Sequence, residues 1–332
     1  MKILVLGGTR FVGRHFVNAA LARDHEVTLF HRGKTNPGLF PGVEEIYGDR
    51  LKDIEKLVGE WDVAVDTCGY FPRAVQISAD HLRDRVEQYM FISTVAVYRD
   101  FSKKGLDETD YLKTLEDPTV EEVNESTYGP LKTECEGVVT GIFPKRSFIV
   151  RPGRIAGPYD PTDRFTYWVH RIGVGGEVLA PNGASEAIQL IDAADLAQWL
   201  VSCIESRECG IYNAAGPTLS FEAMLQACRR ATDSDATFTW VSKDFMHQIE
   251  IDTEAKMPLW NPDATGRTAG YYAVDSSRAE KKGLRYRSME ETARATWKWI
   301  EEHVEDHDWR VGLDLLEERE MLSLWKQKKG KS

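Results

Sequence analysis

The N-terminal half of the chain alternates short apolar runs with stretches of helical periodicity. Five runs have the length of buried strands, at residues 2–7, 26–32, 43–49, 61–68 and 86–94. Between the first two runs, residues 11–24 have the spacing of a helix with one apolar face. Strands that are apolar on both faces and alternate with helices indicate a parallel sheet covered on both sides. The pattern therefore predicts an α/β fold with a doubly wound parallel sheet.

After about residue 150 the pattern changes, because turn-rich stretches interrupt shorter elements. Three later segments have the spacing of amphipathic helices, at residues 192–204, 221–231 and 289–302. A further helix-like segment at 313–325 is predicted to dock on the body of the protein, with dimerisation as the alternative. We therefore predict one domain over residues 1–150 and a smaller C-terminal lobe over residues 151–332, with some strands and helices returning to the first sheet.

Composition limits the possible partners without naming a function. The 332 residues carry 42 basic and 53 acidic side chains, and a net charge of −11 disfavours nonspecific binding to nucleic acid. The five cysteines form no close pair, so we expect reduced thiols and no metal site. No apolar run approaches the roughly 20 residues that span a bilayer, and the N-terminal run is too short for a secretory signal. The expectation is a cytoplasmic protein with no membrane partner.

A glycine-rich turn joins the first strand to the first helix. Gly7, Gly8 and Gly13 occupy this junction in the stretch VLGGTRFVG. In a Rossmann-type fold such glycines let the backbone and the N-terminus of the helix approach a pyrophosphate. We therefore assign a dinucleotide to residues 1–150 and the substrate mainly to residues 151–332. The turn residues expected to bind the cofactor are Gly7, Gly8, Thr9, Arg10, Phe11, Val12 and Gly13.

Basic side chains follow the second strand, where a NAD-binding fold usually carries an acid. This place holds His31, Arg32 and Lys34. An acid binds the ribose 2′-hydroxyl, whereas cations attract a 2′-phosphate. Arg10 replaces the middle glycine of the turn and is expected to close over the same end of the cofactor. The sequence thus predicts NADP in preference to NAD, the alternative being solvated loop charges. Asp49, at the end of the third run, is expected either to contact the adenine or to cap the next helix.

Two polar motifs supply candidate chemistry. Tyr128 and Lys132 are four residues apart, so a helix would place them on one face. An ammonium and the positive nicotinamide ring would lower the pKa of the phenol from roughly 10, so that Tyr128 could act as the acid/base. Ser93 and Thr94 end the fifth run, at the sheet edge where ligands bind in such folds. The motifs together predict hydride transfer between a nicotinamide and a carbinol or carbonyl carbon.

With these motifs in place, the chain resembles the extended-type short-chain dehydrogenase/reductase superfamily, in its NAD(P)-dependent epimerase/dehydratase group, from residue 1 to about 300. The resemblance implies that Thr94, Tyr128 and Lys132 are catalytic, with Ser93 beside them. It extends the set of cofactor-binding residues to Cys68, Lys132 and Arg151. The turn GGTRFVG departs from the commoner GGTGFIG and resembles an atypical branch that includes the chloroplast stem-loop-binding proteins. For the helix-borne Asn of some members, the nearest candidates are Arg73 and Gln76.

The residues after Thr94 narrow the reaction. Val95 and Ala96 stand where 4,6-dehydratases of this group carry Asp-Glu, and Val95 stands where its 3,5-epimerase/reductases carry cysteine. The main hypothesis is therefore an NAD(P)-dependent oxidoreductase. A nucleotide-sugar 4-epimerase with tightly held NAD is the first alternative, and a non-catalytic NADP-sensing or RNA-associated protein is the second.

The substrate lobe offers weaker signals. Arg164, Tyr167, Trp168 and Trp260 could line a substrate pocket, although aromatic residues at helical spacing are more often part of a core. A nucleotide sugar is the substrate that the resemblance implies, and no diphosphate motif in the sequence adds to it.

Overall fold

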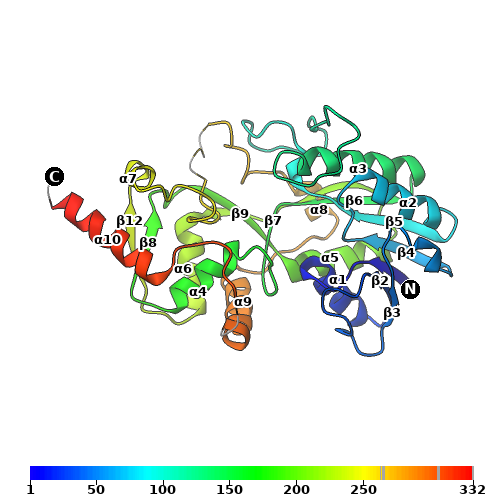
Figure 1. Cartoon of the computed structure of the whole chain (residues 1–332), viewed down its shortest axis with the longest axis horizontal. Coiled ribbons are helices and arrows are strands. Elements are labelled where there is room, and N and C mark those ends of the chain that lie inside the picture. The colour runs from blue at the N-terminus through cyan, green and yellow to red at the C-terminus, as the bar shows by residue number, and fades with distance from the viewer. Residues whose placement is uncertain (262, 264–265, 305–306, 331–332) are drawn as a thin grey trace.

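The structure is a computed structural model, and it describes residues 1–261, 263, 266–304 and 307–330. Within these residues the larger body is built on a seven-stranded parallel sheet (Figure 1). In spatial order its strands are β10 (Gly210–Ala214), β6 (Ser147–Pro152), β5 (Val86–Ile92), β4 (Trp61–Asp66), β1 (Lys2–Leu6), β2 (Glu26–His31) and β3 (Glu44–Tyr47). Each of the five predicted strands is present. The α/β fold with a Rossmann-type, doubly wound sheet is thus confirmed.

Helices bury both faces of this sheet, as the apolar strands require. One face packs against α1 (Phe11–Leu21) and α5 (Ala193–Glu205), and the other against α2 (Pro72–Leu82) and α3 (Tyr128–Ile142). Successive side chains of a strand point to opposite faces. In β1, Ile3 and Val5 therefore join the first core, whereas Leu4 and Leu6 join the second.

Part of the second half of the chain completes the first body. β10 pairs in parallel with β6, and α5 packs beside α1. The short helix α8 (Ser277–Lys281) packs next to β10. The edge of the sheet thus comes from residues beyond 200, and no single boundary near residue 150 separates the two cores.

The smaller lobe surrounds a separate core. Its strands are β7 (Arg154–Ala156), β9 (Ala187–Asp192) and β11 (Thr218–Ser220) in one sheet, and β8 (Glu177–Pro181) with β12 (Thr237–Val241) in another. Its helices are α4 (Arg164–Gly173), α6 (Phe221–Ala231), α7 (Lys243–Gln248), α9 (Met289–His303) and α10 (Leu315–Lys329). The three helices predicted after residue 150 correspond to α5, α6 and α9, and the segment at 313–325 forms α10. Figure 1 shows this lobe on the left, with α10 at its far end.

A buried ion pair joins α3 to β6, the strand next to the edge strand β10. Arg151 of β6 is only 1% exposed, and its Nη2 lies 2.7 Å from Oε2 of Glu136 on α3. Arg151 Nη1 also donates to the hydroxyl of Tyr98, which donates to Asn213 of β10. Ser93, just after β5, donates to Glu136 Oε1 at 2.5 Å. This network fixes the N-terminal turns of α3 against the carboxyl ends of β5, β6 and β10.

Removing the cation from this pair should destabilise the fold. In Arg151→Met the carboxylate of Glu136 stays buried without its partner, so we expect the free energy of unfolding, measured by urea denaturation, to fall by about 3 to 5 kcal/mol. The matched control is Arg99→Ala, because Arg99 is exposed and its guanidinium lies over the ring of Tyr111. The control should lose less than about 1 kcal/mol. Equal losses in the two variants would contradict this role of the ion pair.

Candidate functional site

The glycine turn after β1 has a backbone that only glycine accommodates well. Gly7 and Gly8 have φ values of +97° and +93°. A Cβ on Gly7 would lie 2.5 Å from Oγ1 of Thr67, and one on Gly13 would lie 2.9 Å from Cα of Gly8. The turn therefore packs tightly against β4 and against the start of α1. No side chain caps this helix, and its first turn carries no acid, so its first amides are available to an anion.

A cavity of about 640 Å³ lies over this turn, at the carboxyl ends of β1, β2 and β4. It gathers most of the predicted cofactor-binding residues, namely Gly7, Gly8, Thr9, Arg10, Phe11, Val12, Gly13, His31, Arg32, Lys34, Asp49 and Cys68. A cavity of this size, against a helix N-terminus, suits a dinucleotide.

The charges around this cavity are mainly positive. Arg10, Arg32, Lys34 and Arg310 line it and are exposed, and none of them makes an ion pair with a residue that the structure describes. Asp49 is the acid among the described lining residues. In a chain with a net charge of −11, a group of cations without carboxylate partners fits a ligand that brings its own negative charge. The lining therefore fits the phosphates of a nicotinamide dinucleotide.

Asp49 caps the turn that follows β3 and not the next helix, whose N-cap is Asp53, and it also lines the cavity. Its Oδ1 accepts a hydrogen bond from the backbone N–H of Leu51 at 2.9 Å, and its own N–H donates to Asp53. One carboxylate oxygen thus stabilises the turn after β3. The other makes no hydrogen bond to a described residue, and the side chain still lines the cavity.

Among the lining residues that the sequence did not predict are Arg50, Tyr70 and Arg310. Arg50 makes an ion pair at 2.7 Å with Asp66, the buried last residue of β4. Although burial raises the pKa of Asp66, the Arg50 guanidinium reverses this and holds it below its usual value. An aspartate that ends an otherwise apolar strand signals a buried cation, because an unpaired buried carboxylate is costly. No comparable signal pointed to Arg310, which is far away in the sequence.

The catalytic candidates lie along the carboxyl edge of the sheet. Tyr128 is the first residue of α3, and its hydroxyl lies close enough to the side chain of Thr94 for Thr94 to lower its pKa. The Oγ1 of Thr94 accepts from the N–H of Ala96, which holds the Thr94 side chain in place. Lys132 is 3% exposed, and its Nζ donates to the carbonyl oxygens of Gly69 at 2.6 Å and Ile92 at 2.7 Å. The ammonium thus bridges the ends of β4 and β5.

The protonation of this group differs from the expectation. Burial raises the pKa of Tyr128 to about 12, aided by the nearby Tyr70 and opposed by the side chain of Thr94. Burial also lowers the pKa of Lys132 to about 8. Lys132 directs its protons to two carbonyls. With its pKa raised to about 12, the phenol of Tyr128 is protonated at neutral pH.

Two predicted site residues have other partners. Ser93 is 4% exposed, and its hydroxyl donates a hydrogen bond to Glu136 of α3. Thr94, in contrast, interacts with Tyr128. The guanidinium of Arg151 is held by Glu136 and Tyr98 and does not line the cavity. The structure thus assigns Ser93 and Arg151 to the support of α3.

The candidates for the helix-borne Asn do not enter the site. Arg73 forms an exposed ion pair with Glu121 at 2.6 Å, and Gln76 donates to Asp80. Both lie on exposed positions of α2, and neither lines the cavity.

The predicted substrate residues separate into a core group and a polar group. Trp168 is fully buried and donates to the carbonyl of Pro258, Tyr167 is 4% exposed, and Trp260 is 5% exposed. These rings belong to the core of the smaller lobe, so the pocket interpretation is wrong for them.

Arg164, in contrast, shares a carboxylate with a second arginine. Glu254 lies 2.9 Å from Arg164 and 2.6 Å from Arg154. The guanidinium of Arg154 stacks on the ring of Tyr271, which interacts electrostatically with Tyr128. Arg154 and Arg164 thus share one carboxylate, and Arg154 contacts a tyrosine that interacts with Tyr128.

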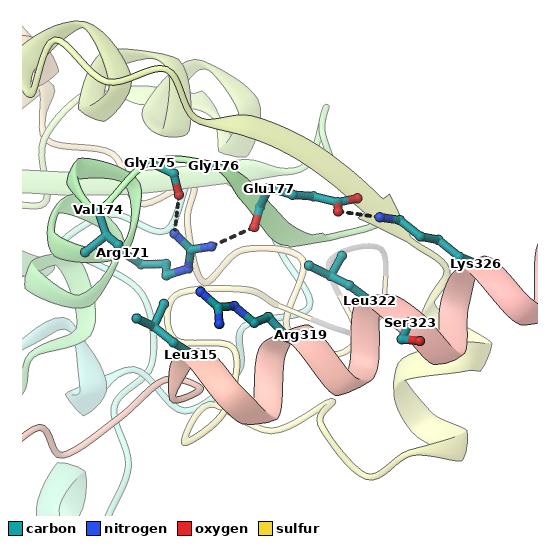
Figure 2. A pocket seen from close by; sticks show the side chains of 10 residues that line it. All are labelled: Arg171, Val174, Gly175, Gly176, Glu177, Leu315, Arg319, Leu322, Ser323 and Lys326. Atoms are coloured by element: carbon teal, nitrogen blue, oxygen red, sulfur yellow. Dashed lines mark hydrogen bonds and ion pairs between the residues drawn. The ribbon is translucent and has the colours of Figure 1, made fainter.

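A second cavity, of about 560 Å³, lies between α4 and α10 in the smaller lobe (Figure 2). Its buried cation, Arg171, is fully engaged: it donates to the carbonyls of Gly175 and Glu177 and to the carboxylate of Glu318. Arg319 projects from α10 at the same cavity. None of the predicted catalytic residues lines it, so this cavity reflects how α10 docks.

Sheet order, glycine turn and Tyr–Lys helix together define a Rossmann-type α/β protein. Similar solved structures include the UDP-N-acetylglucosamine 4-epimerase of Bacillus cereus, at a TM-score of 0.67 and 14% identity over 91% of this chain and 96% of that chain. The UDP-glucuronic acid 4-epimerase of the same organism, in complex with NAD, has a TM-score of 0.66 and 16% identity over 92% and 99%. The UDP-N-acetylglucosamine 4-epimerase of Methanobrevibacter ruminantium M1 has a TM-score of 0.67 and 17% identity over 91% and 98%. The chain thus has the fold of the extended short-chain dehydrogenase/reductase epimerases, as the resemblance implied.

At the level of sequence the similarity is narrower. No family model matches the chain. The chain is 28% identical over 252 residues to the chloroplast stem-loop binding protein of 41 kDa b of Arabidopsis thaliana. The matched region covers 69% of this chain and 63% of that protein. The chain therefore matches less than two thirds of that relative. Among the described residues, no helix is long and apolar enough to cross a membrane.

The buried ammonium of Lys132 should leave a mark on the pH dependence of stability. Its pKa falls from 10.5 in the unfolded chain to about 8 in the folded chain. Between these values the unfolded chain binds more protons, so the contribution of Lys132 to the free energy of unfolding rises with pH. Compared with Lys132→Met, which has no such proton, the wild type should gain about 2 kcal/mol between about pH 7 and pH 9.5 in urea denaturation. Parallel pH curves for the two proteins would mean that Lys132 titrates normally.

Proposed function

We propose that this chain is an NAD(P)-dependent oxidoreductase of the epimerase/dehydratase group, with Tyr128 as its acid/base. The observation that carries the proposal is the interacting pair of Tyr128 and Thr94, one helical turn from Lys132 and at the same sheet edge as the glycine-lined cavity. These three side chains do not line the cavity themselves, but a proton donor and a second hydroxyl lie at the edge of the sheet where the dinucleotide-sized cavity opens.

Each side chain has a distinct part in such a reaction. A nicotinamide dinucleotide bound in the cavity would supply or accept the hydride. The hydroxyl of Tyr128 transfers the proton of the substrate oxygen, and Thr94 holds that oxygen by a hydrogen bond. Because the pKa of Tyr128 is raised to about 12, the phenol is protonated at neutral pH, which suits the donation of a proton to a carbonyl oxygen. Lys132 holds the segment after β4 and the end of β5 together through hydrogen bonds to the carbonyls of Gly69 and Ile92.

Replacing Tyr128 by Phe should abolish turnover and spare cofactor binding. The ring is retained, but the proton donor is lost, so we expect the rate to fall at least about 100-fold and up to about 10,000-fold. Turnover is measured with a panel of UDP-hexoses and their 4-keto derivatives, and binding by titration with NADPH. Tyr111→Phe is the matched control, because Tyr111 is 77% exposed. Undiminished turnover in Tyr128→Phe would remove Tyr128 from the mechanism.

For the cofactor, the proposal favours NADP over NAD. Support comes from Arg32 and Lys34, which follow β2, line the cavity, and make no ion pair with a described residue. A 2′-phosphate would give these cations a partner, and arginine can bind it through two parallel hydrogen bonds. The similar UDP-glucuronic acid 4-epimerase of Bacillus cereus is in complex with NAD. This complex supports the binding of a nicotinamide dinucleotide here, but it does not support the 2′-phosphate that distinguishes NADP.

The choice between NADP and NAD can be measured directly. Fresh protein is denatured to identify any released dinucleotide, and the protein is then titrated with NADPH and NADH by fluorescence. We expect NADPH to bind at least about tenfold more tightly, and Arg32→Ala to remove most of that preference while leaving the affinity for NADH nearly unchanged. Stoichiometric NAD released from the wild type would contradict the preference and would favour an epimerase, which recycles its hydride on a tightly held cofactor.

For the substrate, the proposal is a nucleotide sugar. The similar solved structures are UDP-sugar 4-epimerases, and Arg154 and Arg164 offer cations on the catalytic side of the smaller lobe. A 4-epimerase is therefore the first alternative to a net oxidoreductase. The two differ in their products, since only an epimerase returns its cofactor unchanged while converting one UDP-hexose into another.

An RNA-associated role is the second candidate. It is favoured by the relative named as a chloroplast stem-loop binding protein and by the likeness of GGTRFVG to that branch. The net charge of −11 weighs against it, as do the retained Thr94, Tyr128 and Lys132. Repeating the NADPH titration in the presence of a stem-loop RNA separates the two, because displacement of NADPH would favour the RNA-associated role.

A further inference from the structure

The segment between α9 and α10 reaches back to the cofactor cavity. Residues 307–313, here called the C-terminal strap, lie in the sequence between α9 and α10 and run to the start of α10 (Figure 1). In the middle of the strap, Arg310 lines the cavity above the glycine turn, next to Pro161 and Thr162. The smaller lobe thus contributes a cation to a cavity that is otherwise built mainly by the first body.

A buried carboxylate holds the strap in this position. Asp163 is 1% exposed, and its Oδ1 lies 2.8 Å from Nε2 of His307. Its Oδ2 accepts a hydrogen bond from the backbone N–H of Arg310 at 3.1 Å. The backbone that carries the Arg310 side chain is therefore fixed directly to the residue that precedes α4.

Close packing on both sides of Arg310 adds to this anchoring. The ring of Trp309 stacks on His170 of α4 with centroids 4.4 Å apart. The N–H of Gly312 donates to the carbonyl of Ala255 at 2.7 Å, and a Cβ on Gly312 would lie 2.1 Å from the ring of Tyr167. The strap is thus a packed part of the lobe and leaves little freedom to the backbone of Arg310.

The guanidinium of Arg310, unlike its backbone, is not held by the described residues around it. Its side chain is exposed and makes no hydrogen bond or ion pair with a residue that the structure describes. A rigidly held backbone with an uncommitted cation that lines a cavity is the arrangement expected of an anion ligand.

The position of Arg310 indicates which phosphate it faces. The loop before Asp163 packs on the first turns of α1: His15 Nε2 lies 3.0 Å from the carbonyl of Pro158, and Arg14 stacks on Tyr159 at 3.5 Å. Arg310 is therefore brought to the N-terminal end of α1, where free amides attract a pyrophosphate. Arg32 follows β2 instead, at the side expected for the 2′-phosphate.

We propose that Arg310 is a pyrophosphate ligand, supplied by the substrate lobe through the C-terminal strap. The inference rests on the proposed dinucleotide binding and adds a residue to it. Since both dinucleotides contain the pyrophosphate, Arg310 contributes equally to the binding of NADP and NAD. It also joins the two lobes across the bound cofactor.

The test compares Arg310→Ala with Arg319→Ala by fluorescence titration of the full chain with NADPH and NADH. Arg319 is an exposed arginine on α10 at the other cavity (Figure 2), so it controls for the loss of one positive charge. We expect Arg310→Ala to weaken both dinucleotides by similar factors, roughly 10- to 100-fold, as for the loss of one hydrogen bond to a charged group. Arg319→Ala should leave both dissociation constants unchanged, and Arg310→Lys should recover part of the affinity.

Two results would overturn the assignment. Unchanged affinities in Arg310→Ala would show that the guanidinium does not contact the cofactor. A loss confined to NADPH would place it at the 2′-phosphate, which contradicts a pyrophosphate ligand. Failure of the proposed function looks different, because the wild type itself would then bind neither NADPH nor NADH.

Discussion

The buried ion pair between Arg151 and Glu136 is the interaction on which the site depends. It joins β6, the strand next to the edge of the sheet, to α3, the helix that begins with Tyr128, and so helps to determine where the phenol lies. Glu136 also accepts a hydrogen bond from Ser93, whereas Thr94 interacts with Tyr128. Of the two adjacent hydroxyl residues at the end of β5, one thus binds a carboxylate two turns into α3, and the other is directed to the phenol at the start of that helix.

Charge is distributed unevenly over the molecule, and this distribution favours an anionic ligand. The chain has an excess of acids, and some of its least exposed arginines lie next to carboxylates, as Arg50 does with Asp66 and Arg171 with Glu318. Four exposed cations that line the cavity at the glycine turn make no ion pair with a residue that the structure describes: Arg10, Arg32, Lys34 and Arg310. Mutual repulsion among these cations costs stability in the absence of an anion. The same repulsion is relieved by phosphates, so the ligand's charge contributes to its own affinity.

The local sequence pattern was sufficient to predict the fold class, the glycine turn and the Tyr128–Lys132 pair. The roles of other site residues depend on contacts with residues far away in the sequence. Apolar runs and helical spacing predicted β1 to β5, α5, α6 and α9, because each is buried along a continuous face. The turn from Gly7 to Gly13 and the pair of Tyr128 and Lys132 carry their geometry within a few residues. Roles that depend on a distant partner could not be predicted in this way: Trp168 is committed to Pro258, and Arg310 is brought to the cavity by Asp163.

The burial of Lys132 and Tyr128 shifts the pKa values of both side chains toward their neutral forms. Lys132 is buried, with its protons directed to two backbone carbonyls, and its ammonium is destabilised enough for its pKa to fall to about 8. Tyr128 is destabilised as a phenolate, so its pKa rises to about 12. Each group is thus poised toward its neutral form, which is what burial without a close opposite charge produces. A positive charge next to the phenol would lower its pKa, and a negative charge near the ammonium would raise that of Lys132. A dinucleotide that carries both a positive ring and anionic phosphates would therefore complete an electrostatic arrangement that the chain leaves unbalanced.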